Sequence, residues 1–184
     1  MEEICQFIIN NHIYTIYNVN KIQGKDNYVG RSHYDDRTIY VEKGTKVKLT
    51  SLSESDIYYT LDGSVPTTKS KKYTEPITIN NNTIIRAISY KKGYIESDVE
   101  SRTFLTGRKH DLPVVSISTN SSNLFGSKGI FTFGPNTNWV YPYYGANFWD
   151  STEVPIGFEY YENGTLGVEL TAGMKIFGGW SRGE

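Results

Sequence analysis

Hydrophobic residues in this chain alternate with polar ones far more often than they recur at helical spacing. No long stretch combines apolar positions three to four apart with a convincing helix cap. Short alternating runs are instead separated by turn signals such as Asp62-Gly63 and Asn163-Gly164. Alternating runs between such turns are typical of an all-β sandwich or barrel. The sequence therefore predicts a mainly β protein: an immunoglobulin-like β-sandwich followed by a partial β-rich segment.

Residues 39–106 carry the clearest unit of this pattern. Val47 and Leu49 share one face of an expected strand. Residues 83–90 are β-branched and apolar enough for a central strand, with Arg86 at an edge of its buried face. About six or seven short strands fit this span, which is the size of a minimal immunoglobulin-like sandwich.

The sharpest alternation lies near the end of the chain. Six apolar side chains occupy consecutive even positions, namely Leu166, Val168, Leu170, Ala172, Met174 and Ile176. Only a strand places all of them on one face. With the turn signal at Asn163-Gly164, residues 154–177 should form an antiparallel hairpin with one apolar face. A hairpin alone cannot bury that face, so either residues 112–150 cover it or its cover lies outside this sequence.

Composition changes near residue 110. Residues 1–110 carry 16 Lys and Arg against 13 Asp and Glu, whereas residues 111–184 carry 3 against 7 and hold all three Trp. We therefore expect four parts: an extended N-terminal segment (1–38), an immunoglobulin-like module (39–106), a polar linker (107–111) and a second β-rich part (112–184).

Charge and residue usage exclude several classes of function. The formal net charge is −1, and phosphate neutralisation needs clustered Lys and Arg, so no nucleic-acid partner is expected. A single Cys excludes a disulfide scaffold, and the three His are isolated, so no metal ligand is expected. The chain has no apolar run long enough for a membrane span, and its acidic start lacks the positive charge of a secretory signal peptide.

Residues 57–105 carry a recognisable signature, Tyr-Thr-x-Asp-Gly-Ser-x-Pro-Thr at positions 59–67. Together with Tyr73, Pro76-Ile77 and residues 83–88, it resembles the chitobiase/β-hexosaminidase C-terminal module. That resemblance implies an immunoglobulin-like accessory domain of the kind common in bacterial secreted and surface proteins.

Residues 112–182 resemble the opening of the CotH (spore coat protein H) kinase-like family. The matching residues, in order, are 112–119, 123–125, 129–131, Pro155, 158–161 with Asn163-Gly164, and 172–182. The resemblance implies a full-length parent that is an atypical ATP- and Mg-dependent protein kinase of the spore coat or bacterial surface, acting on protein substrates or coat proteins. Because the family's nucleotide-facing Lys and catalytic and metal-binding acids would follow these blocks, residues 112–184 are expected to be the non-catalytic, truncated N-terminal part. No catalytic residue and no cofactor is assigned to this chain itself.

The Gly-rich block near the end is the most site-like stretch. Gly178, Gly179, Ser181 and Arg182 could bring backbone N–H groups and a guanidinium to phosphate oxygens, and the family resemblance places this block near the nucleotide. The alternative is a flexible turn. The overlapping Gly-x-Ser-x-Gly spacing has no acid and His after it, so hydrolase chemistry is not predicted.

Aromatic residues gather between these blocks. Trp139, Tyr141, Tyr143 and Trp149 could stack on sugar rings, or could simply pack a core or loop. If these rings bind a ligand, the alternative function is that of a carbohydrate- or partner-binding surface module of a secreted bacterial protein. The nearby acids Asp150, Glu153, Glu159 and Glu162 suggest a glycosidase pair, but solvated surface carboxylates are the expected interpretation.

Overall fold

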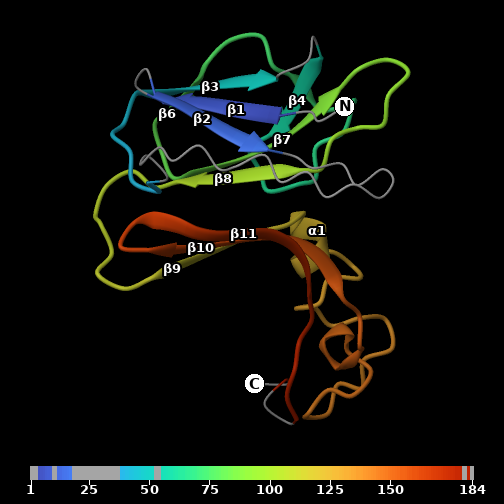
Figure 1. Ribbon diagram of the computed structural model, residues 1–184. Helices are drawn as coiled ribbons and strands as arrows, with labels where there is room; N and C mark the ends of the chain where they lie inside the picture. The colour runs from blue at the N-terminus through green and yellow to red at the C-terminus, as the bar shows by residue number, and fades with distance from the viewer. Residues whose placement is uncertain (1–3, 10–11, 18–37, 52–54, 180–181, 183–184) are drawn as a thin grey trace, which may run out of the picture.

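The computed structural model describes residues 4–9, 12–17, 38–51, 55–179 and 182. The protein is mainly β, and the described strands form three antiparallel sheets. Two sheets make a sandwich, and a third, smaller sheet lies beside it with a long loop extending away (Figure 1). The predicted fold class is therefore confirmed. No described helix is long and apolar enough to span a lipid bilayer.

The sandwich consists of two four-stranded sheets. The first has the order β2-β1-β3-β6, with β1 (Ile4–Ile9), β2 (His12–Tyr17), β3 (Thr45–Ser51) and β6 (Ile77–Ile79). The second has the order β5-β4-β7-β8, with β4 (Asp56–Thr60), β5 (Lys71–Lys72), β7 (Thr83–Tyr90) and β8 (Glu100–Phe104). Alternate side chains of both sheets meet in one core that includes Val47, Leu49, Ile57, Tyr59, Ile79, Ile85 and Phe104.

The N-terminal residues contribute strands to this sandwich. β1 pairs antiparallel with β2 and, through its other edge, with β3, in a register that sets Phe7 opposite Leu49. Residues 4–9 and 12–17, expected as part of an extended segment, thus form two antiparallel strands that extend the β3-β6 sheet. Ile13 and Ile16 both lie in β2.

The third sheet has the order β11-β10-β9, with β9 (Val114–Ser118), β10 (Val154–Glu162) and β11 (Thr165–Met174). β10 and β11 are the hairpin that the alternation predicts. Asn163 and Gly164 turn the chain with φ of 51° and 78°, the left-handed conformation that Asn and Gly tolerate. The connection from β9 to β10 contains only a short helix, α1 (Ser121–Phe125), and a 3-10 turn, η1 (Asn147–Trp149).

A β-bulge changes which side chains share a face of this hairpin. Tyr160 lies opposite Val168, but Tyr161 lies opposite Leu166, so Gly167 has no partner in the register. One extra residue reverses the alternation. Leu166 consequently turns toward the sandwich and is buried, while Val168 stays on the outer face. The prediction that all six even positions share one face is wrong for Leu166.

A short stretch near residue 39 joins the third sheet to the sandwich. Ile39 donates its N–H to the carbonyl of Gly164 at 2.9 Å and accepts the N–H of Leu105 at 2.7 Å. Its side chain is fully buried against Tyr161 and Leu166. The two parts of the chain therefore pack on each other through a small apolar cluster at this end.

The long β9–β10 connection covers only one end of the third sheet. Ile130 is 2% exposed and packs on Val154 and Ile156, with Leu124 and Met174 beside them. Farther along the same face, Val168 and Leu170 are 43% and 46% exposed. Residues 112–150 thus cover part of the apolar face and leave the remainder open.

Candidate functional site

Buried polar groups line the contact between the sandwich and the third sheet. β8 is an edge strand, and its outward N–H groups at Ser101 and Thr103 donate to carboxylates of the third sheet. Ser101 donates to Glu169 at 3.0 Å, and Thr103 donates to Glu159 at 3.1 Å. These carboxylates satisfy backbone groups that would otherwise be open to another strand.

Glu159 overturns one sequence expectation. It was expected to be a solvated surface acid, but it is only 1% exposed. It accepts hydrogen bonds from the Thr103 hydroxyl at 2.6 Å and from the Tyr161 hydroxyl. Burial, followed by the charge of Glu159, raises the pKa of Tyr161. A carboxylate enclosed in this way cannot reach a glycosidic bond, whereas Asp150, Glu153 and Glu162 are exposed as expected.

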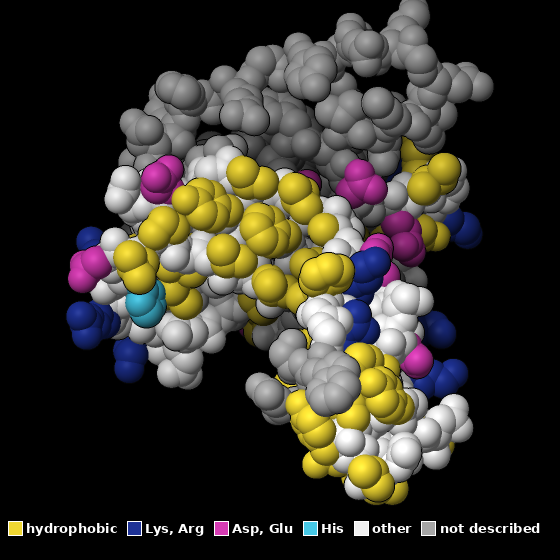
Figure 2. Space-filling view, turned by 90° about the horizontal axis from the view of Figure 1, so that it is seen from below, with side chains coloured by type: hydrophobic (Ala, Val, Ile, Leu, Met, Phe, Trp, Pro, Cys, Tyr) yellow, Lys and Arg dark blue, Asp and Glu magenta, His cyan; other side chains and the backbone are white. Residues whose placement is uncertain are grey.

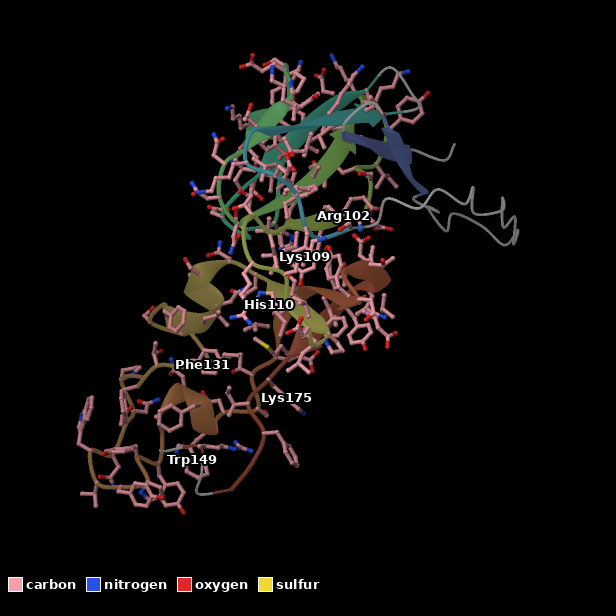
Figure 3. All side chains as sticks on the ribbon, turned by 90° about the vertical axis from the view of Figure 1, so that its left-hand side faces the viewer. Arg102, Lys109, His110, Phe131, Trp149 and Lys175 are labelled. Carbon is pink, nitrogen blue, oxygen red and sulfur yellow. The ribbon has the colours of Figure 1, made fainter. Side chains whose placement is uncertain are left out.

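A second acid pair lies farther along the same contact. Burial, then the charge of Glu169 and a hydrogen bond with it, raise the pKa of Glu100 well above its ordinary value. Burial opposes the charge on Arg102, but Glu169, Tyr161 and Glu159 together outweigh it and raise its pKa. Arg102 lies 3.9 Å from Glu169 between the two parts of the chain (Figure 3).

Arg86 lies deeper than expected at this contact. It was placed at an edge of the buried face, yet it is 2% exposed. Its guanidinium donates to the carbonyl of Gly63 at 2.8 Å and to the hydroxyl of Ser101 at 3.2 Å. Burial lowers its pKa, with the charge of Glu159 acting in the opposite direction. Arg86 is thus held in place by hydrogen bonds to other residues of the chain.

The signature turn at Asp62 also faces the third sheet. Asp62 accepts the N–H of Ser64 at 3.0 Å, and this side chain and backbone hydrogen bonding lowers the Asp62 pKa. A Cβ on Gly63 would meet the carbonyl oxygen of Thr119 at 2.8 Å, so glycine is required for this close approach. An open depression of about 340 Å³ adjoins the turn, lined by Tyr59, Thr60, Leu61, Asp62, Ser64, Ser70 and Lys71.

The structure places the Gly-rich block beside the long loop. Arg182 donates to the carbonyl of Gly178 at 2.7 Å and to that of Trp149 at 3.3 Å, and its guanidinium lies 5.4 Å from the Trp149 ring centre. Gly179 is exposed, and Ser181 lies outside the described residues. A phosphate at Arg182 would have to compete with these carbonyl partners. Among the described residues no three His, Cys, Asp or Glu side chains gather as a metal site would require.

The four candidate aromatic residues lie in one lobe built by the long loop. Phe133 connects them: it stacks on Trp139 with ring centres 5.0 Å apart and meets Tyr143 edge-on at 5.2 Å. Tyr141 contacts Tyr143 edge-on, and Trp149 forms the other end of the lobe with Tyr144. Sequence analysis missed Phe133, although its alternation with Phe131 could have marked it as part of the cluster.

Figure 2 shows apolar side chains gathered over the outer face of the third sheet. Cross-strand register sets them in two rows of three, Val115–Tyr160–Val168 and Ile117–Phe158–Leu170. Val115, Ile117, Val168 and Leu170 are each between 43% and 52% exposed. We call these six residues the open face.

Comparison with known protein families gives a match for the sandwich strands β3 to β8. Residues 47–104, which span β3 to β8, match a protein-family model described as "Fn3 associated". The match supports a β-rich, immunoglobulin- and fibronectin-like character for residues 47–104. No curated protein and no solved structure significantly matches the chain.

Proposed function

We propose that this chain is the non-catalytic N-terminal part of a CotH-like spore-coat or surface protein, whose full-length form is an atypical ATP-dependent protein kinase. The observation that carries the proposal is the open face. Its sheet packs a polar face on the sandwich and leaves an apolar face uncovered. A domain buries the apolar face of a sheet against a further layer, so this sheet has the character of half a core.

The positions of the resembling blocks support this proposal. Residues 112–119 contain β9, residues 158–161 lie in the middle of β10, and residues 172–182 follow from the end of β11. Three of the blocks thus overlap the strands of the uncovered sheet, while residues 123–125 lie in α1 and residues 129–131 in the long loop. The family-model match at 47–104 covers most of the stretch that resembles the chitobiase/β-hexosaminidase C-terminal module, and it agrees with an accessory domain ahead of a second one.

ATP and magnesium belong to the proposed parent, and the described residues of this chain do not fit them well. Arg182 is occupied by backbone carbonyls, and the described residues offer no acidic cluster for a divalent cation. The role that remains for Gly178, Gly179 and Arg182 is to shape one wall of a nucleotide site whose charged groups come from elsewhere in the parent. Protein substrates or coat proteins are the proposed partners.

The proposal is tested by comparing this chain with an extended protein that also contains the residues encoded after Glu184. With ATP and Mg²⁺, the extended protein should transfer labelled phosphate to a protein substrate, and this chain should transfer none. Hydrogen exchange at Phe158 and Leu170 should slow in the extended protein, since a new layer covers them. A reading frame that closes at Glu184, or an extended protein without transfer, would overturn the proposal.

A second function, a carbohydrate- or partner-binding surface module, is favoured by a different observation. The long-loop lobe holds aromatic rings in the open, with Trp139 71% exposed and Tyr144 50% exposed. This function would require nothing beyond the present chain.

A further inference from the structure

The aromatic lobe differs chemically from the rest of the chain. Between Gly129 and Trp149 there are eight aromatic residues and no Asp, Glu, Lys, Arg or His. The lobe extends away from the sandwich, with Trp149 near its far end (Figure 3). The segment itself therefore contributes an aromatic surface without charged side chains, flanked by the exposed amides of Asn136 and Asn138. Arg182 adds a cation at its Trp149 end, where the guanidinium lies 5.4 Å from the ring centre.

The Trp139 ring lies on this surface with one face packed against another aromatic ring. One face stacks on Phe133 at 5.0 Å with an interplanar angle of 29°, while 71% of the residue remains exposed. Phe133 is held in turn by Phe148, which meets it edge-on at 5.5 Å and is itself buried. A ring supported from behind and open in front can receive a flat apolar partner at little cost in side-chain freedom.

Tyr141 and Tyr144 supply further open rings. Tyr141 is 46% exposed and rests edge-on against Tyr143. Tyr144 is 50% exposed and lies 4.9 Å from Trp149, ring centre to ring centre. Each of these rings has another aromatic ring behind it and a hydroxyl group that can donate or accept a hydrogen bond.

The backbone beneath the rings is fixed by hydrogen bonds. The two N–H groups of the Asn147 side-chain amide lie within hydrogen-bonding distance of three acceptors, the carbonyls of Ser127 at 2.9 Å and Gly129 at 3.1 Å and the Thr132 hydroxyl at 2.9 Å. The N–H of Asn138 donates to the carbonyl of Tyr144 at 2.8 Å, which closes the loop that carries Trp139. The platform is thus formed before any ligand arrives, which lowers the entropic cost of binding.

We infer that this lobe is a binding platform for an uncharged, β-linked pyranose chain. Pyranoses with equatorial substituents offer flat C–H faces that fit open aromatic rings, and Asn and Tyr groups match their hydroxyls. Residues 129–149 supply no cationic side chain, and Arg182 at their Trp149 end already donates to backbone carbonyls. This disfavours nucleic acid, which needs phosphate neutralisation, and anionic membrane surfaces, which attract Lys and Arg. The inference does not depend on the proposed phosphotransferase parent.

The test measures retention of the whole chain in affinity gels that contain soluble β-1,4-glucan or chitin oligomers, alongside pull-down on cellulose and chitin. Trp139→Ala should weaken binding about tenfold or more, and Tyr141→Ala should weaken it less. Tyr94→Ala is the matched control, because Tyr94 and Tyr141 are both 46% exposed but Tyr94 lies outside the lobe. Trp139→Phe should restore part of the affinity.

Melting temperature separates loss of binding from loss of folding, and it should be unchanged in the exposed-ring variants. Wild type that is not retained by either glycan, or Trp139→Ala that is retained equally, would overturn the inference. Preferential binding of the wild type to anionic vesicles would also overturn it, in favour of a membrane surface. None of these outcomes bears on phosphate transfer, so the two proposals fail separately.

Discussion

Glu159 and Thr103 form a two-point contact between the middle strand of the third sheet and the edge strand of the sandwich. One carboxylate oxygen accepts the Thr103 N–H at 3.1 Å, and the other accepts its hydroxyl at 2.6 Å. A side chain therefore takes the place that a neighbouring strand would fill along β8. Glu169 accepts the N–H of Ser101 on the same strand, and the backbone carbonyl of Ile39 accepts the N–H of Leu105, the residue after β8.

Removing the Glu159 carboxylate should destabilise the protein strongly. Glu159→Ala leaves the Thr103 N–H and the Tyr161 hydroxyl without this partner inside the contact, at a cost of about 3 kcal/mol. We expect the melting temperature to fall by roughly 5–10 °C. Glu162→Ala, an exposed change on the same strand, should alter it by less than about 1 °C. Equal effects in thermal unfolding by circular dichroism would show that the buried contact contributes nothing.

The Glu100–Glu169 pair should make stability depend on pH. The pKa of both groups is raised, chiefly by burial, so the folded chain retains protons that the unfolded chain releases. Stability should therefore fall as pH rises from the ordinary carboxyl pKa of 4.5 through the raised folded-state pKa. Glu100→Gln preserves the size of the side chain and a hydrogen bond to Glu169 while removing one titrating group.

The melting temperature of Glu100→Gln should exceed that of wild type by an amount that grows as the pH rises above the ordinary carboxyl pKa of 4.5. Glu96→Gln, an exposed change in the loop before β8, should show no such trend. A Gln variant that is less stable than wild type at the higher pH would mean that ionised Glu100 is stabilised by Arg102, and would reverse the assignment.

Gly157 is required for the close approach of β10 to the sandwich. A Cβ at this position would lie 2.5 Å from the Ser118 hydroxyl and 3.0 Å from the Ser101 hydroxyl. Gly157→Ala should cost about 1–3 kcal/mol of unfolding free energy, measured in urea. Gly167→Ala meets only ordinary contacts, 3.5 Å from the Tyr160 ring, and should be tolerated. Ser118→Ala should recover part of the loss in the double variant, since the nearer clash disappears.

Periodicity was a sufficient guide to the strands but not to their partners. Alternation at Val47, Leu49 and residues 154–177 predicted β3 and the β10–β11 hairpin, because period two is a local property of an extended chain. The burial of Glu159 and Arg86 was missed, because it depends on which surface packs against β8, and that is decided by contacts far apart in sequence. The bulge at Gly167 was missed for a related reason. A residue can be identified as a bulge only when the pairing register of its strand with the neighbouring strand is known.

The candidate sites also differ in how far the sequence alone could predict them. The aromatic residues Trp139, Tyr141, Tyr143 and Trp149 could be named because their density is visible in sequence, and the structure gathers them in one lobe. The alternation of Phe131 and Phe133 could have added Phe133 to the cluster, but which rings it contacts could not be derived, because the rest of the loop has no periodicity. The assignment of Gly178, Gly179, Ser181 and Arg182 to a nucleotide rests on resemblance and stays a prediction.

The open face should make this chain self-associate, and charging it should prevent this. Val115 and Leu170 lie at opposite edges of the face and are 52% and 46% exposed, so lysine at either position can extend into water without disturbing the core. We expect Val115→Lys with Leu170→Lys to lower binding of the dye ANS severalfold and to shift sedimentation toward monomer, because contiguous apolar surface drives both. Leu61→Lys is the control: Leu61 is 45% exposed but lies on the sandwich, so its replacement should change neither measurement. If the double variant binds ANS and associates as wild type does, the apolar surface responsible lies elsewhere, and the open face loses its standing as the uncovered half of a core.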